Sequence, residues 1–257
     1  MRKIIKSQLY QLKFNRLTIF LFIALVAFGI AQAIVEINLN QRLGKIVTGG
    51  DFAALNGGMQ VIVALLFVVV CTAQTCFGDF VDKTTNYELM SGHMRWQVFW
   101  GRVITTIMVT IPATLILILT PVVTVTAIYG WGTKLDIGGI LIRLALMMLP
   151  ILRHCCELML LGFISKSPYI VMAGGYLYFV LVMQFYESDS LFLASTNLIS
   201  LSRIEVWTTF GLDSELNYIY DTGLDYTVII GTIVVSLLVS AGSLLLGYIF
   251  FKKDDQN

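Results

Sequence analysis

Six long apolar stretches, separated by more polar segments, dominate the hydrophobic pattern of this chain. About 20 consecutive apolar residues carry an α-helix across the hydrocarbon core of a bilayer. The stretches close to or above this length are residues 17–35, 59–77, 103–131, 137–164, 169–186 and 226–251. The pattern therefore predicts an all-α integral membrane protein in which a single domain, residues 1–257, contains six transmembrane helices.

The amino-acid composition favours a membrane protein over the soluble classes. Of the 257 residues, 57% are hydrophobic and 13% are charged, whereas a soluble domain has about 45–50% apolar and about 25% charged residues. The net charge of +1 provides no basic field for nucleic acid. The first apolar run is too long for the core of a signal peptide and no small-residue cleavage pattern follows it, so we expect it to be retained.

The distribution of Lys and Arg between the polar segments predicts the orientation. With a cytoplasmic N-terminus, the inner segments hold eleven basic residues and the outer segments hold four. The inner residues are Arg2, Lys3, Lys6, Lys13, Arg16, Lys83, Arg95, Arg102, Lys166, Lys252 and Lys253, and the outer ones are Arg42, Lys45, Lys134 and Arg203. Because basic residues concentrate in cytoplasmic flanks, both termini are predicted to be cytoplasmic, which requires an even number of spans.

The N-terminal segment, residues 1–16, is basic and amphipathic. On a helix, one face is apolar apart from Gln8 and consists of Ile4, Ile5, Leu9 and Leu12, while the basic residues occupy the remainder. Such a helix lies in the membrane interface and is attracted to anionic lipid of the inner leaflet. A plain positive flank before the first span explains the same residues, and the pattern leaves both interpretations open.

The polar segment between the second and third spans, residues 78–102, contains signals for a short helix. Thr85 followed by Glu88 fits a capping box, and Gly92 provides a left-handed helix stop. A helix of under two turns is unstable alone in water and must dock on something. It carries the apolar residues Tyr87, Leu89 and Met90, so we interpret it as a docking helix for a cytoplasmic partner; the alternative is a capped turn that only reverses the chain.

This segment resembles the short cytoplasmic helix of the membrane subunits of type-2 ABC exporters, the ABC-2 type permeases. The matching residues are, in order, Asp79, Asp82, Thr84, Thr85, Glu88, Leu89, Gly92 and Arg95. The six predicted spans, the basic N-terminal helix and the long outer segment before the last span extend the resemblance over the whole chain. The subgroup that it most resembles is the permeases of bacitracin-type and lantibiotic-immunity-type exporters.

The resemblance implies a permease subunit in a bacterial cytoplasmic membrane that exports an amphipathic substrate such as a peptide antibiotic. A separate ABC ATPase subunit, in two copies, would bind ATP and Mg²⁺, since this chain has no P-loop and is not expected to be an enzyme. The ATPase-coupling helix would comprise Thr85, Tyr87, Glu88, Leu89, Met90, Gly92 and Arg95. A second permease chain, identical or similar, would complete a homodimer or heterodimer.

The fourth span contains the polar residues Arg153, His154 and Glu157. Charged residues within a span usually face a bundle interior or a water-filled cavity, and Arg153 and Glu157 are spaced to pair along one helical face. They are candidates for an intramembrane polar lining of the translocation path or of a subunit interface; a structural ion pair and a span that ends sooner are the alternatives. Because adjacent helical residues point in different directions, we expect no metal site at His154 and its neighbours Cys155 and Cys156.

The long outer segment, residues 187–225, is acidic and contains an apolar run at 191–201 that is too short to span. We expect a re-entrant or interfacial helix there. Two other functional classes compete with the transporter. A membrane enzyme finds no support, since the chain lacks the HExxH and G-x-S-x-G motifs, whereas a non-transporting membrane anchor or sensor subunit fits the same topology.

Overall fold

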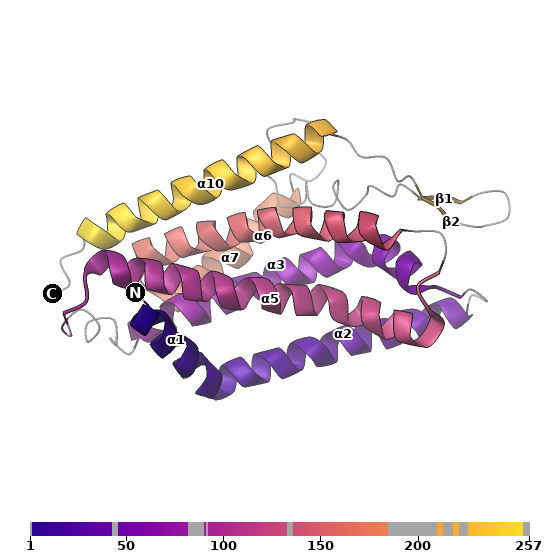
Figure 1. Cartoon of the computed structure of the whole chain (residues 1–257), viewed down its shortest axis with the longest axis horizontal. Helices are drawn as coiled ribbons and strands as arrows, with labels where there is room; N and C mark the ends of the chain where they lie inside the picture. The colour runs from indigo at the N-terminus through magenta and orange to yellow at the C-terminus, as the bar shows by residue number, and fades with distance from the viewer. Residues whose placement is uncertain are drawn as a thin grey trace.

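The computed structural model describes residues 2–42, 46–81, 90, 92–132, 136–184, 210–212, 218–220 and 226–253. Its helices are α1 (Arg2–Phe14), α2 (Arg16–Arg42), α3 (Gly49–Val81), α5 (Arg95–Tyr129), α6 (Ile137–Ser165), α7 (Pro168–Gln184) and α10 (Tyr226–Lys253), as Figure 1 shows. Two short antiparallel strands, β1 (Phe210–Leu212) and β2 (Tyr218–Tyr220), pair between α7 and α10. The predicted re-entrant helix at 191–201 lies outside the described residues.

Four of the described helices are long and apolar enough to cross a membrane. They are Thr18–Arg42, Arg95–Tyr129, Ile137–Ser165 and Ile229–Lys253. The prediction of a helical, multi-pass membrane protein is therefore confirmed at this level. The other two predicted spans, 59–77 and 169–186, fall on α3, whose apolar part is described over Val63–Gly78, and on α7, which has 17 residues.

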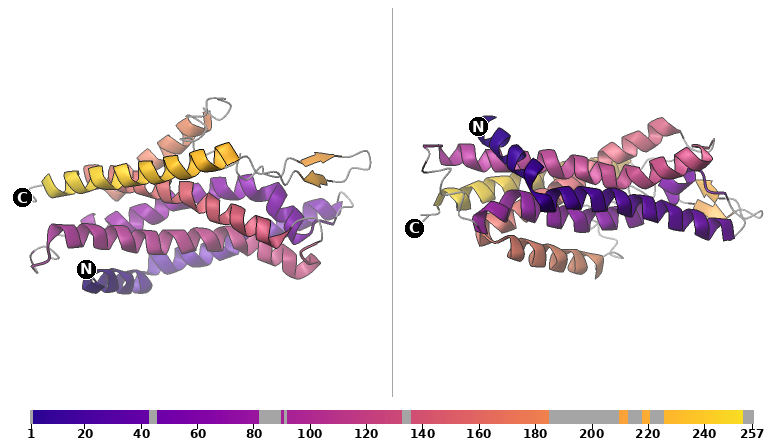
Figure 2. Two further views of the ribbon diagram at one scale, coloured as in Figure 1. Left: turned by 45° about the horizontal axis from the view of Figure 1, so that its top comes forward. Right: turned by 90° about the horizontal axis from the view of Figure 1, so that it is seen from below.

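The long helices run lengthwise between two ends of the molecule, which Figures 1 and 2 show from three directions. Both termini and the start of α5 lie at one end, which we call the terminal end, and the β1–β2 hairpin lies at the opposite hairpin end. The ends of α6 and α10, next to Lys166 and Lys252 in the sequence, lie at the terminal end with the basic helix α1. Basic residues from distant parts of the sequence are thus gathered on the side that the charge distribution assigns to the cytoplasm.

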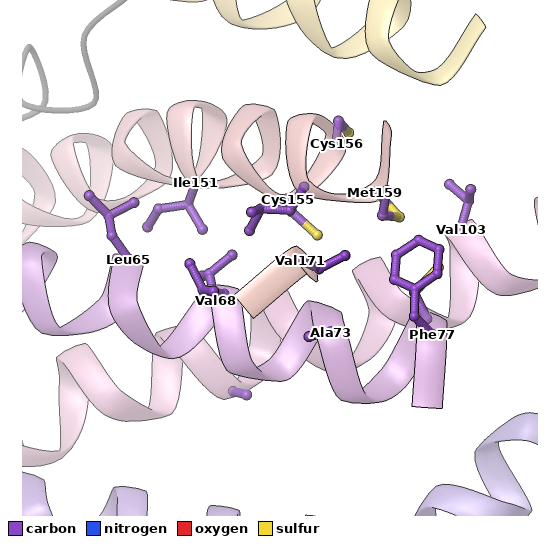
Figure 3. Packing of buried hydrophobic residues seen from close by; sticks show 14 of the residues in the cluster. Leu65, Val68, Ala73, Phe77, Val103, Ile151, Cys155, Cys156, Met159 and Val171 are labelled. Carbon is purple, nitrogen blue, oxygen red and sulfur yellow. The ribbon is translucent and has the colours of Figure 1, made fainter. Parts of the chain in front are cut away.

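The main core forms where α3 packs against α5, α6 and α7. Figure 3 shows Leu65 and Val68 of α3 facing Ile151 of α6, with Val171 of α7 beside them. Small residues let the helices approach closely: a Cβ on Gly175 of α7 would lie 2.7 Å from Val69 of α3. In a membrane, where lipid is as apolar as the core, such close packing is a principal force between helices.

At the hairpin end, the start of α3 is held by both its own cap and the end of α5. The hydroxyl of Thr48 donates to the carboxylate of Asp51 at 2.7 Å, as in a helix-capping pair. The first amides of α3, Gly49 and Gly50, donate to the carbonyls of Gly130 and Trp131, each at 2.9 Å. Backbone donors that a helix start leaves without an intrahelical acceptor therefore join α3 to the end of α5.

At the terminal end, α1 packs on α5 through the side that contains Ile4 and Gln8. Gly101 of α5 provides the space, because a Cβ there would lie 2.8 Å from the Cγ2 atom of Ile4. Gln8 is 4% exposed, and within the described part of the chain neither polar atom of its amide has a hydrogen-bond partner. This residue, which interrupts the apolar face in the sequence, is therefore buried in the structure.

We expect Gln8→Met to raise the free energy of unfolding by about 1 kcal/mol, because it replaces a buried amide without partners by an apolar side chain of similar shape. The measurement is unfolding of the full chain in detergent micelles. Gln11→Met makes the same chemical change at an exposed position of α1 and should leave stability unchanged. A loss of stability in Gln8→Met would show that the amide has a partner, and would contradict the prediction.

Candidate functional site

Three residues of the predicted coupling helix are described, and four are not. Thr85, Tyr87, Glu88 and Leu89 lie outside the described residues. Met90 is 81% exposed, and Gly92 has φ +87°, in the left-handed region that the predicted helix stop requires. Arg95 is the first residue of α5. In the described part of this segment, Met90 is helical and exposed, and the turn at Gly92 leads into a long helix.

Arg95 joins the start of α5 to the end of α10. Its Nη1 atom donates a hydrogen bond of 2.7 Å to the backbone carbonyl of Lys252. The last carbonyls of a helix lack intrahelical donors and attract positive charge, so an arginine is a suitable partner there. The two residues are 157 positions apart in the sequence, and no sequence pattern predicted their contact.

A group of aromatic rings lies about one turn from this contact along α5, and we call it the aromatic cluster. It is centred on Phe99 of α5, which is fully buried. The ring centroid of Phe99 lies 4.7 Å from that of Phe163, 5.3 Å from that of Tyr248 and 5.8 Å from that of Phe251. Phe77 of α3 lies 5.1 Å from Phe163. The cluster therefore connects α3, α5, α6 and α10 at the terminal end.

A second arginine connects α5 to α3 beside the aromatic cluster. Arg102 is 1% exposed, and its Nη1 atom donates to the carbonyl of Cys76 at 3.0 Å. In the sequence Arg102 is only an inner flanking charge, but in the structure it is buried between the two helices. The helices on either side of the predicted coupling segment are thus joined to each other near their ends.

The polar residues of α6 form a compact group, which we call the α6 polar cluster: Arg153, His154 and Glu157 of α6 with Tyr178 of α7. The Nε atom of Arg153 lies 2.9 Å from Oε1 of Glu157, and the side chains are 4% and 22% exposed. The His154 ring stacks on that of Tyr178 with centroids 5.7 Å apart and planes at 17°. Nδ1 of His154 lies 3.9 Å from Oε2 of Glu157, beyond hydrogen-bond distance.

This geometry bears on the alternatives for the fourth span. The helix α6 continues to Ser165, so the helix itself does not end before the polar residues, and where the span ends stays a prediction. Arg153 and Glu157 are paired with each other along one face, as their spacing predicts. Their contact is that of a partly buried structural ion pair, and the role of these residues as a polar lining stays a prediction.

The two adjacent cysteines of α6 point in different directions. Figure 3 shows Cys155 pointing toward α3 and Cys156 pointing toward α10. The sulfur of Cys155 lies 3.4 Å from the hydroxyl oxygen of Thr72. The two thiols therefore do not converge with each other, which agrees with the helical geometry used in the sequence analysis.

A row of buried hydroxyl groups on α10 was not predicted from the sequence. It consists of Thr232, Ser236, Ser240 and Ser243, and α10 packs mainly against α6. Their spacing of four, four and three residues places them on one helical face. A search for polar periodicity within the apolar span would have found this face, because small hydroxyl residues are enriched where membrane helices pack.

No model of a known protein family matches the chain, and none of the curated proteins matches it significantly.

Proposed function

We propose that this chain is the membrane-spanning permease subunit of an ATP-driven exporter of the ABC-2 type, in a bacterial cytoplasmic membrane. In this proposal α2, α3, α5, α6, α7 and α10 are six spans, and the terminal end faces the cytoplasm. Two such chains, identical or similar, enclose a path for an amphipathic substrate such as a peptide antibiotic. Two copies of a separate ATPase subunit bind ATP and Mg²⁺ and act on the segment between α3 and α5.

The observation that carries the proposal is the connected helix end beside that segment. Arg95 bonds to the end of α10, Arg102 bonds to the end of α3, and Phe99 packs against rings of α6 and α10. A force applied to the turn at Gly92, just before α5, would therefore reach four helices through direct contacts. This is what coupling to a partner requires, since coupling is carried by packed side chains and rigid helices.

The test replaces Tyr87, Glu88 and Leu89 together by alanine in the full chain. If these residues hold the ATPase, we expect at least a tenfold loss of ATP-hydrolysing activity that co-purifies with the chain, because apolar anchors dominate small interfaces. ATP hydrolysis in the purified membrane complex and its stimulation by bacitracin or a lantibiotic are the two measurements. Unchanged ATPase association and unchanged transport would refute the coupling.

A matched control comes from the same end of the molecule. Lys166, Tyr169 and Ile170 are exposed beside the start of α7, and replacing them together removes similar side chains without touching the predicted coupling segment. This control should retain the ATPase. If wild-type chain binds an ATPase whose activity no tested compound changes, the non-transporting anchor or sensor subunit is the better description.

A further inference from the structure

The exposed side of α1 differs from the side that the hydrophobic pattern assigns to the membrane. The pattern places Ile4 on the lipid face, but Ile4 is 3% exposed and sits against Gly101 of α5. With Gln8 also buried, part of the apolar face is used for packing against the protein. Ile5, Leu9 and Leu12 of that face are only partly exposed, so the most exposed surface of α1 lies on the side away from Ile4 and Gln8.

That remaining surface combines lysines with two aromatic rings. Tyr10 is 66% exposed and Phe14 is 61% exposed, and their ring centroids lie 4.7 Å apart. The Nζ atom of Lys13 lies 5.9 Å from the centroid of Phe14, within the range of a cation–π contact. Lys3 and Lys6 are exposed and precede Tyr10 by about two turns and one turn, so they lie on the same side of the helix.

The charge on this surface has no acidic counterpart nearby in the sequence. Arg2, Lys3, Lys6, Lys13 and Arg16 are all exposed, and the first acidic residue of the chain is Glu36. The short link between α1 and α2 determines where this surface lies relative to the membrane. Only Asn15 separates α1 from α2, and the membrane-length part of α2 begins at Thr18. The surface therefore lies at the height of the lipid headgroups, where aromatic and basic residues concentrate.

We propose that Lys3, Lys6 and Lys13, with Tyr10 and Phe14, form a binding surface for the phosphate headgroups of anionic phospholipids in the adjacent leaflet. Lysines beside an anionic membrane surface increase the binding constant by about fivefold each. Because Ile4 of α1 packs against Gly101 of α5, lipid bound to α1 also stabilises the first turns of α5. This inference does not depend on the exporter function, since it requires only a bilayer at the terminal end.

The experiment uses the full chain in nanodiscs of phosphatidylcholine with increasing fractions of phosphatidylglycerol. Native mass spectrometry measures which lipids remain bound after release. Wild type should retain phosphatidylglycerol in preference to phosphatidylcholine, and Lys3→Gln/Lys6→Gln/Lys13→Gln should reduce this preference by at least about tenfold, given the contribution of each lysine. The control Lys166→Gln/Lys252→Gln/Lys253→Gln removes three exposed lysines from the same end and should keep the preference.

Several outcomes would contradict the proposed lipid-binding surface. One is an equal loss in both triple variants, which would indicate a general charge effect, and another is the lack of any preference in wild type. If soluble glycerol phosphate at millimolar concentration displaces the lipid, α1 has a site for free phosphate and not a surface for the bilayer. Unfolding temperatures in pure phosphatidylcholine verify that the exposed lysine variants are folded.

Hydrogen exchange in α5 tests separately whether lipid binding at α1 stabilises α5. Hydrogen exchange at residues 95–101 should slow in wild type when phosphatidylglycerol is added. Ile4→Ala should keep the lipid preference, because it leaves the lysines in place, but it should abolish the slower exchange in α5. If Ile4→Ala leaves the α5 response unchanged, the contact with Gly101 does not transmit lipid binding, and this part of the proposal is wrong.

Discussion

Replacing Arg153 by methionine is expected to lower the free energy of unfolding by about 3–5 kcal/mol, because it leaves a partly buried carboxylate without its partner. In the folded chain, the guanidinium of Arg153 lies 2.9 Å from Glu157, and the arginine side chain is only 4% exposed. Lipid and packed helices provide little water to replace the lost partner. Reversible unfolding in mixed micelles measures the effect.

The double variant Arg153→Met/Glu157→Met separates the ion pair from other roles of the arginine. Removing both charges should recover most of the lost stability, since replacing a whole buried pair by apolar residues is often neutral or favourable by about 1–4 kcal/mol. If the double variant is no more stable than Arg153→Met, the pair with Glu157 is not the cause. Glu157→Gln adds a functional readout: normal folding and normal transport would exclude the carboxylate from any translocation path.

Replacing Phe99 by alanine should destabilise the chain by about 3–5 kcal/mol, through the loss of ring contacts and the cavity that remains. Phe99 is fully buried at the centre of the aromatic cluster, where rings of α5, α6 and α10 meet it. The expected effect extends to the start of α5, because Arg95 also joins α5 to α10 there. Unfolding in micelles measures stability, and hydrogen exchange at 95–101 reports the local loosening.

A matched control exists on α2, where Phe20 is 68% exposed. Phe20→Ala removes the same atoms from a side chain that faces away from the protein, so the loss should stay below about 1 kcal/mol. Phe99→Leu retains part of the volume and should fall between the two alanine variants. Equal effects of Phe99→Ala and Phe20→Ala would contradict a special role of the aromatic cluster.

Local sequence determined the features that depend on neighbours within one helix. The apolar length of residues 103–131 and 137–164 predicts long helices, and α5 and α6 cover these ranges almost completely. Gly92 has the left-handed φ that a stop for the short helix before it requires. Arg153 and Glu157 pair because a helix places residues four apart on one face. In each case the physical cause acts within a few residues.

Only the tertiary structure decided which face of each helix meets which neighbour. The sequence did not predict the hydrogen bond from Arg95 to Lys252, the burial of Arg102 or the contact of Ile4 with Gly101. In a soluble protein an apolar stripe marks the buried face. In this chain both lipid and protein interior are apolar, so hydrophobicity marks the span but not its packing face, which small residues and shape determine.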